Sequence, residues 1–354
     1  MLDTRQLRGN QAMLDNAMWG QRRFGWLPLF DPLHGQTVLE PTGAGTGYWV
    51  GAPSVCYDGE VARFYLYYRV REPRPVRGKE CRIAVSEDGL HFRTIWSATQ
   101  VEIGTSSMEG ACLCRTPAGR WRLYLSYVHA SDSRWRVDLL EAGSIETLDV
   151  CQRRTILTPD DCGTEAVKDP WVAMVGPLYI MLASIATRPT AAGQVLHASG
   201  DAYATGMVKG STGIALSEDG IKWRWQGEVF APSASGWDKW AARLNSLVYV
   251  PPVWLGFYDG AADVTENYEE RCGLVVSTDL RHFERVSASG PAMVSPYASG
   301  SIRYTDGIYA QGAYWFYYEF ARADGAHELR VSRVPALFSC GAAVAGVERL
   351  GESG

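Results

Sequence analysis

A seven-residue pattern recurs along the chain and limits its fold more than any other feature. It reads Ser86-Glu-Asp-Gly-Leu-His-Phe92, then Ser217-Glu-Asp-Gly-Ile-Lys-Trp223, and more loosely Ser277-Thr-Asp-Leu-Arg-His-Phe283. Each copy follows a short run suited to a β-strand and precedes a run that carries an aromatic residue. Because Asp-Gly between two such runs favours a tight hairpin, we assign the aspartates of the pattern to turns and place no chemistry in them.

The spacing of the copies predicts how many units the chain contains. The copies begin at Ser86, Ser217 and Ser277, so they are 131 and 60 residues apart. The longer interval is about twice 65, which leaves room for a degenerate copy near residues 139–149, and a truncated copy lies at 329–332. The chain therefore divides into five units of roughly 55–75 residues, a spacing typical of repeat architectures.

Each unit also carries an earlier hairpin. The five predicted turns are Asp58-Gly59, Pro117-Ala-Gly119, Gly176-Pro177, Pro251-Pro252 and Gln311-Gly312. Two hairpins make four strands, and repeated four-stranded units are typical of a β-propeller. We therefore predict an all-β fold, a five-bladed β-propeller of four-stranded antiparallel blades around a central channel.

The propeller is expected to form a single domain over residues 46–340. A short helical or extended segment at 1–45 would pack on its outside, with a short helix between Gln6 and Met18. Residues 341–354 would form a tail. No low-complexity linker divides the chain.

Composition and charge exclude several classes of protein. No run approaches the ~18 consecutive apolar residues of a membrane span, and the first ten residues lack the apolar core of a signal peptide, so we expect a cytoplasmic protein. The net charge of −5 argues against a nucleic-acid binder. The excess of Arg, 29 against 5 Lys, is typical of a GC-rich bacterial genome. The eight cysteines form no Cys-x-x-Cys pair, so we expect reduced thiols, no metal and no cofactor.

Polar residues are predicted to converge at one mouth of the channel. Alignment of the five first hairpins on their turns places Ala52, Glu109, Asp169, Asn245 and Asp306 in equivalent positions on the innermost strands. Four of these five are polar and precede apolar strands. Polar groups that converge in a concavity are typical of a ligand site; the alternative is that they cap strands or bind channel water.

The loops between second and third strands are expected to rim the same mouth. The candidates for ligand binding on and near them are Arg69, Trp171, Arg243, Tyr258, Asp259, Arg303, Glu319 and His327. The polar run 266–271 either belongs to this rim or is an exposed, solvated loop.

The layout resembles the five-bladed glycoside hydrolases of families 43, 62, 32, 68 and 130, and the resemblance covers nearly the whole chain as a blade pattern. Lys168-Asp-Pro170 resembles the Asp-Pro motif of those families, in which the Asp supports the transition state or acts as a base. Met108-Glu-Gly110 resembles the motif of the general acid, although on a different blade. The resemblance implies that Asp169 and Glu109 are the central carboxylates.

One departure from the family pattern concerns the first blade, where families 32 and 43 carry a catalytic Asp and this chain has Gly51-Ala-Pro53. A glycosidase needs an acid and a second carboxylate. Three assignments of the catalytic groups therefore stay open. Asp169 and Glu109 form the pair alone, or Asp306 supplies the missing group. In the third assignment, the attacking group is a phosphate, as in family 130. The phosphate would be held by Arg69, Arg71, Arg243 and Arg303.

We therefore expect a glycosidase-type enzyme that acts on a small glycoside or oligosaccharide in the channel. One alternative is a non-hydrolytic propeller that binds a glycan or acts on a small molecule in a biosynthetic pathway. Another is a phosphate-dependent glycoside phosphorylase. The expected partner is a carbohydrate or other small molecule, with no nucleic acid and no membrane; the sugar, the linkage and the oligomeric state stay open.

Overall fold

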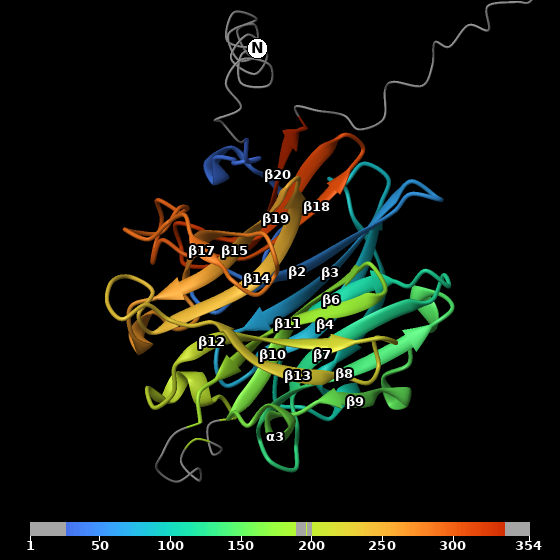
Figure 1. The fold of residues 1–354 in the computed structure, drawn as a ribbon, viewed down its shortest axis with the longest axis horizontal. Helices are drawn as coiled ribbons and strands as arrows, with labels where there is room; N and C mark the ends of the chain where they lie inside the picture. Colours follow the sequence, from blue (N-terminus) through green and yellow to red (C-terminus); the bar gives the residue numbers. More distant parts are fainter. Residues whose placement is uncertain (1–25, 189–195, 197–199, 337–354) are drawn as a thin grey trace, which may run out of the picture.

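The computed structural model describes residues 26–188, 196 and 200–336. Its strands form five antiparallel groups of four that succeed one another around the molecule (Figure 1), which confirms the predicted five-bladed β-propeller. The predicted helix between Gln6 and Met18 and the tail at 341–354 lie outside the described residues.

The strands of the first three blades follow the chain in order. Blade one contains β2 (Trp49–Asp58), β3 (Arg63–Glu72), β4 (Arg77–Ser86) and β5 (Arg93–Thr99). Blade two contains β6 (Met108–Arg115), β7 (Trp121–Val128), β8 (Trp135–Ala142) and β9 (Arg154–Leu157). Blade three contains β10 (Ala166–Val175), β11 (Leu178–Ala186), β12 (Gly210–Ser217) and β13 (Arg224–Phe230).

Blade four repeats the same order, and blade five takes one strand from the beginning of the chain. Blade four contains β14 (Ala241–Val250), β15 (Val253–Ala261), β16 (Arg271–Ser277) and β17 (Glu284–Arg285). Blade five contains β18 (Ile302–Ala310), β19 (Ala313–Ala321), β20 (His327–Pro335) and β1 (Gln36–Leu39). Strand β1 pairs antiparallel with β20, with Gln36 opposite Val331. This pairing closes the ring of blades, and it gives residues 36–39 a place in the propeller itself.

The helices of the described residues are short, and all except η2 lie between strands. They are α2 (Gln100–Ile103), α3 (Pro159–Cys162) and the 3₁₀ turns η2 (Pro32–His34), η3 (Ile145–Thr147), η4 (Val150–Gln152), η5 (Ala202–Thr205) and η6 (Val264–Glu266). No helix in the described part of the chain is long and apolar enough to cross a bilayer.

The repeated pattern forms the turn between the third and fourth strands of blades one, three and four. In blade three, Ser217 Oγ accepts hydrogen bonds from the N–H groups of Asp219 and Gly220 at 3.3 and 2.8 Å. Asp219 Oδ1 accepts from the N–H groups of Ile221 and Lys222, each at 2.8 Å. The other two copies make the same bonds, which confirms that the pattern holds turns.

Replacing Ser217 by Ala is expected to lower the free energy of unfolding by about 1–3 kcal/mol, because the buried N–H of Gly220 loses its acceptor. Urea denaturation measures the loss. The exposed Ser235→Ala is the control and is expected to stay within about 0.5 kcal/mol of the wild type. Equal stability of the two variants would contradict this account of the turn.

Aromatic side chains fill the spaces between neighbouring blades. The rings of Phe64 and Trp315 are 4.9 Å apart and join blades one and five. The rings of Tyr65 and Trp121 are 4.6 Å apart and join blades one and two. β-Branched and aromatic side chains pack well on the half-buried face of a β-sheet. Most aromatic residues therefore serve the fold rather than a ligand.

Candidate functional site

The innermost strand of each blade is interrupted by a β-bulge near its start. In β2, β10 and β18 the bulge contains a residue with left-handed backbone, Ala52 at φ 50°, Asp169 at φ 50° and Tyr304 at φ 52°. A bulge bends its strand and redirects the side chains on it. All three residues line one cavity in the central channel.

The structure corrects the predicted register of blade five. Tyr304, not Asp306, matches Ala52 and Asp169, because each of these three lies six residues before the end of its strand, at Ala310, Asp58 and Val175 respectively. Asp306 lies two residues further along β18, past the bulge. The sequence did contain the information needed for the correct register, since the position of Tyr304 can be counted back from the turn at Gln311-Gly312.

Asp306 joins blade five to blade one. Its Oδ2 accepts a hydrogen bond from the N–H of Val55 at 2.7 Å, as Ser54 Oγ of blade one accepts from the N–H of Leu113 in blade two at 3.0 Å. Burial raises the pKa of Asp306 to about 7, although the hydrogen bonds from Val55 and Gly307 oppose the rise. Asp306 also lines the channel cavity, so it is a channel carboxyl that is substantially protonated near neutral pH.

Asp169 is the second carboxyl that lines the channel cavity. Its Oδ1 accepts a hydrogen bond from the N–H of Gly110 at 2.9 Å, and its Oδ2 lies 3.1 Å from Lys168 Nζ. The ammonium group of Lys168 is in turn held over the ring of Trp135 at 5.0 Å. The Lys-Asp-Pro sequence therefore places an ion-paired carboxylate on the channel wall of blade three.

Glu109 is clamped by cations from blade one. Its Oε1 lies 2.9 Å from Arg71 Nη1, and its Oε2 lies 3.2 Å from Arg69 Nε. The hydroxyl of Tyr304 donates to Oε2 at 3.1 Å. Burial by itself raises the pKa of Glu109, but the charges of Arg69, Lys168 and Arg71 outweigh it and hold the pKa well below its ordinary value. A carboxylate held in its charged form is unsuited to donate a proton.

The other predicted arginines are paired with buried glutamates. Glu319 Oε2 lies 2.8 Å from Arg69 Nη2, and Glu319 Oε1 lies 2.8 Å from Arg303 Nε. Glu270 lies 3.1 Å from Arg303 and also contacts Arg243. Four guanidinium groups, those of Arg69, Arg71, Arg243 and Arg303, thus share three glutamates, so each has a carboxylate partner although the cations outnumber the anions.

Asp259 and Asn245 connect the mouth of blade four to blade five. Asn245 Nδ2 donates to Asp259 Oδ1 at 2.6 Å, and the N–H of Tyr304 donates to the same oxygen at 3.1 Å. Burial first, and then the charge of Glu270, raise the pKa of Asp259 to about 7. Asn245 lines the channel cavity.

His327 ties blade five to the loop of blade four. Its Nδ1 lies 2.7 Å from Glu319 Oε1, and its Nε2 lies 3.1 Å from Glu269 Oε2. The imidazole stacks on the indole of Trp49, with ring centres 4.5 Å apart. His327 is fully buried, so it holds the mouth together rather than facing solvent.

The structure does not bring Tyr258 or Trp171 to the channel cavity. Tyr258 is fully buried, and its hydroxyl donates to Asp238 at 3.1 Å. Trp171 packs edge-on against Trp254 between blades three and four, with ring centres 6.3 Å apart.

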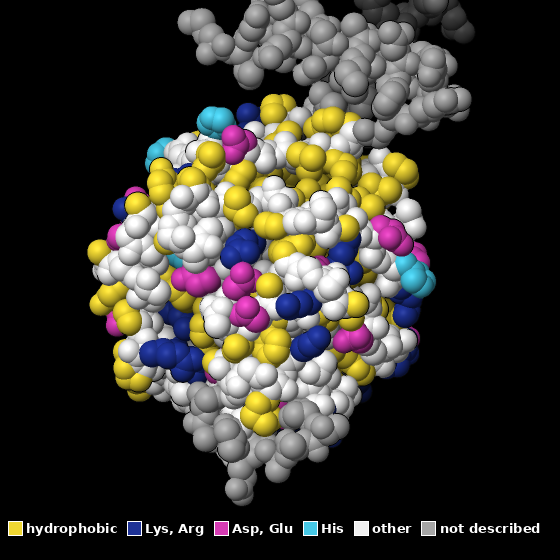
Figure 2. Space-filling view, turned by 90° about the vertical axis from the view of Figure 1, so that its left-hand side faces the viewer, with side chains coloured by type: hydrophobic (Ala, Val, Ile, Leu, Met, Phe, Trp, Pro, Cys, Tyr) yellow, Lys and Arg dark blue, Asp and Glu magenta, His cyan; other side chains and the backbone are white. Residues whose placement is uncertain are grey.

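The channel cavity is narrow, with a volume of about 20 Å³. A space of this size holds roughly one water molecule, so a glycoside reaches Asp169 and Asp306 only when the channel widens. Basic and acidic side chains are interspersed on the face shown in Figure 2 rather than gathered into a patch of one sign. Within the described residues, no group of His, Cys, Asp or Glu is arranged to hold a metal ion.

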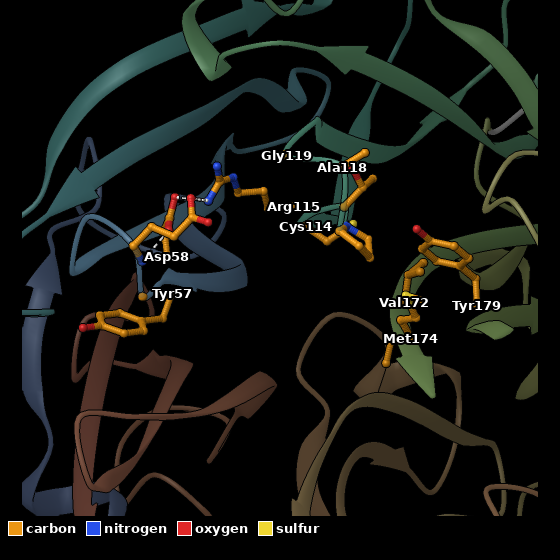
Figure 3. Close-up of a pocket in the computed structure, with 14 residues that line it drawn as sticks. Tyr57, Asp58, Cys114, Arg115, Ala118, Gly119, Val172, Met174 and Tyr179 are labelled. Carbon is orange, nitrogen blue, oxygen red and sulfur yellow. Dashed lines mark hydrogen bonds and ion pairs between the residues drawn. The ribbon is translucent and has the colours of Figure 1, made fainter. Parts of the chain in front are cut away.

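A larger cavity of about 760 Å³ lies where the first hairpins of blades one to three turn (Figure 3). Tyr57 and the ion-paired Asp58 and Arg115 form one wall, and Met174 and Tyr179 form the other (Figure 3). None of the predicted site residues lines it. It is therefore separate from the channel carboxyls.

Sequence reasoning missed two residues at the mouth. Tyr304 could have been found by counting back from the turn of its hairpin. Tyr268, whose hydroxyl is bonded to Arg74 and Asp201, lies in the polar run 266–271 but was not singled out within it. Its partners come from loops of blades one and three, and only the folded chain brings them together.

No protein-family profile and no curated protein matches the chain. Solved structures do. One described as a glycoside hydrolase is 16% identical with a TM-score of 0.64, over 85% of this chain and 90% of that one. The chain has the propeller fold of the glycoside hydrolases. A β-1,2-mannobiose phosphorylase from Listeria innocua is 15% identical with a TM-score of 0.57, over 88% and 96% of the two chains. An α-L-arabinofuranosidase from Lactobacillus brevis is 14% identical with a TM-score of 0.58, over 80% and 90%.

This resemblance to propeller glycoside hydrolases and phosphorylases was predicted from the blade pattern, and the comparison of structures confirms it. At these identities the likeness is one of fold. The roles of individual residues rest on the geometry of the channel.

Proposed function

We propose that the protein hydrolyses glycosides at its central channel. The observation that carries the proposal is that Asp169 and Asp306, two buried carboxyls in different environments, line the same channel cavity. Glycoside hydrolysis requires one carboxyl group that donates a proton and a second that acts as a carboxylate, and different environments allow these two roles.

The two carboxyls would take different roles. Asp306, whose pKa is raised to about 7 by burial, would protonate the oxygen of the leaving group. Asp169, paired with Lys168, would act as the second carboxylate, which attacks the anomeric carbon or takes a proton from the attacking water. Glu109 would stay ionised and fix Tyr304 and the blade-one arginines in place. Asp306 of blade five would thereby supply the carboxyl that blade one lacks at Ala52.

Water rather than phosphate is the attacking group in this proposal. The arginines Arg69, Arg71, Arg243 and Arg303 are each paired with a buried carboxylate. Bringing a phosphate among them would require breaking buried ion pairs, each costly to lose.

The test is hydrolysis of a panel of aryl furanosides and pyranosides, with and without inorganic phosphate. Turnover that does not depend on phosphate supports the proposal. Turnover that requires phosphate would favour the phosphorylase alternative. Binding without turnover on any sugar would favour a propeller that only binds glycans.

The assignment of Asp306 predicts a pH dependence. Because its raised pKa of about 7 keeps the carboxyl protonated below that pH, kcat/KM is expected to fall about tenfold per pH unit above pH 7. Asp306→Asn would remove this limb of the profile together with most of the activity. A wild-type profile that stays level from pH 6 to 9 would argue against Asp306 as the acid.

A further inference from the structure

A short segment of blade four covers the mouth of the channel. We call residues 267–270, between η6 and β16, the mouth segment. Glu270 pairs with Arg243 and Arg303 beneath it, and Glu269 contacts His327. The charged groups underneath are buried, so nothing reaches them from solvent while the mouth segment keeps this position.

Tyr268 is the part of the mouth segment that reaches across the opening. Its ring lies 4.5 Å from the guanidinium carbon of Arg71, and its centre lies 6.4 Å from that of Trp49. Its hydroxyl accepts a hydrogen bond from Arg74 Nη2 at 2.5 Å and donates to Asp201. One side chain from blade four is thus held by groups from blades one and three.

The backbone of Tyr268 is strained in this position. Its φ of 75° lies in the left-handed region, which residues with a bulky side chain rarely adopt. Strain of this kind persists only where surrounding contacts hold it, and it is typical of ligand clamps and switches. Here the contacts that hold it are those of the ring and the hydroxyl, together with the hydrogen bond from the N–H of Tyr268 to Glu270 Oε1 at 3.1 Å.

The partners of Tyr268 are those that a sugar residue would use. A sugar hydroxyl can accept a hydrogen bond from an arginine and donate one to a carboxylate. The hydroxyl of Tyr268 does the same with Arg74 and Asp201. The indole of Trp49 borders this position, with its ring centre 6.4 Å from that of Tyr268. Its ring is packed against the imidazole of His327 at 4.5 Å and the guanidinium groups of Arg71 and Arg303 at 4.8 Å.

The acidic groups around this position are already paired with arginines. Asp201 lies 3.7 Å from Arg74 and 3.3 Å from Arg77, and Glu109 is shared by Arg71 and Arg69. A neutral polyol exchanges hydrogen bonds with these groups and adds no charge to them. An anion would compete with Asp201 for Arg74.

We propose that Trp49, Arg71, Arg74 and Asp201 form a sugar-binding subsite that Tyr268 occupies, and that a sugar binds there by displacing the Tyr268 side chain. The choice of a sugar as ligand rests on the proposed function. Arg71 also contacts Glu109, which accepts from Tyr304 at the channel cavity. The subsite therefore connects through hydrogen bonds with Tyr304, which lines the channel cavity together with Asp169 and Asp306.

The proposal has a quantitative consequence for binding. When the competent state is a minor fraction of the population, the apparent dissociation constant is the intrinsic one divided by that fraction. Removing the ring of Tyr268 makes the subsite available in every molecule. Tyr268→Ala is therefore expected to bind sugars at least about tenfold more tightly than the wild type.

The first test measures opening and needs no ligand. The N–H groups of Asn267 and Glu269 are bonded to Val264 and Glu266 at 3.1 and 2.9 Å, so their hydrogen exchange reports on release of the mouth segment. We expect these amides to exchange at least about tenfold faster than those of β15, and faster still in Tyr268→Phe, which lacks the hydroxyl. Exchange no faster than in β15, in wild type and variant alike, would overturn the proposal.

The second test measures affinity in the Asp169→Asn background, where substrate is not consumed. Methyl and aryl glycosides of the panel are titrated by calorimetry against Tyr268→Ala, Tyr268→Phe and the control Tyr309→Ala, whose exposed side chain lies far along β18. Tighter binding by Tyr268→Ala alone, or by both Tyr268 variants, supports the subsite. Weaker or unchanged binding would overturn it, because Tyr268 would then be a sugar contact or a purely structural side chain.

The outcome is separable from the fate of the proposed function. Sugars that bind more tightly to Tyr268→Ala, with no turnover by any variant that retains Asp169, would refute hydrolysis and leave the subsite standing. Turnover that depends on Asp169, with binding insensitive to Tyr268, would refute the subsite alone. Failure of every sugar to bind any variant would refute both.

Discussion

Replacing Asp169 by Asn is expected to lower kcat for glycoside hydrolysis by at least ~10²-fold, the lower range for the loss of a positioned acid–base group. The amide oxygen of Asn can still accept the hydrogen bond from Gly110, so the blade-two contact survives. What disappears is the negative charge beside Lys168. Steady-state kinetics on the best substrate of the panel, with thermal unfolding of both proteins, measures the effect.

A matched control separates loss of charge from loss of chemistry. Asp160 is largely exposed and forms an ion pair with Arg134 at 2.9 Å, outside the channel. Asp160→Asn is expected to retain kcat within twofold. If Asp169→Asn retained wild-type kcat as well, Asp169 would not be the second carboxylate, and the channel would not be the reaction centre in the form proposed.

The largest loss of stability is expected for Glu319→Gln. This fully buried carboxylate contacts Arg69, Arg303 and His327 at 2.7–2.8 Å. Glutamine keeps the shape but not the charge, and it leaves two buried guanidinium groups without full compensation. Removing one partner of a buried ion pair costs about 3–5 kcal/mol. Urea denaturation at pH 7 measures the change in free energy of unfolding.

The same carboxylate predicts the direction of the pH dependence. Burial alone would raise the pKa of Glu319, but Arg303 and Arg69 hold it below its ordinary value. Its contribution to stability is therefore present above the ordinary glutamate range and is lost as the pH falls toward the lowered pKa. Glu319→Gln should lack this part of the acid sensitivity. A loss under 1 kcal/mol, comparable with that of the exposed Glu87→Gln, would contradict the account of the network.

The fold could be predicted because its signals are local. The hydroxyl of Ser217 and the carboxylate of Asp219 bond to each other and to the next few backbone groups. Three readable copies of one turn and five hairpin turns were therefore enough to count blades. The strand β1 carried no such signal, since residues 36–39 are few and their partner β20 lies at the other end of the propeller.

The site was predicted less completely, for two physical reasons. The bulge with left-handed backbone at Tyr304 has no glycine to mark it, and although the turn at Gln311-Gly312 allows the position to be counted, the register of β18 was misplaced by two residues. The ion pairs join residues far apart in the chain; Arg69 and Glu319 are 250 positions apart. Residue types predicted that Arg69 and Arg303 belong to the mouth and allowed carboxylate partners for them, but not which carboxylates hold them.

The pairing of β1 with β20 has a consequence for how the protein is made. Gln36 and Val331, which pair with each other, are separated by 295 positions, so the ring cannot close until nearly the whole chain has left the ribosome. Pairings this distant in sequence slow folding. Until the partner arrives, the growing chain exposes an unpaired strand edge, which is a template for association with other chains. Yield in the cell should therefore depend on translation speed and chaperone supply more than on the stability of the finished ring.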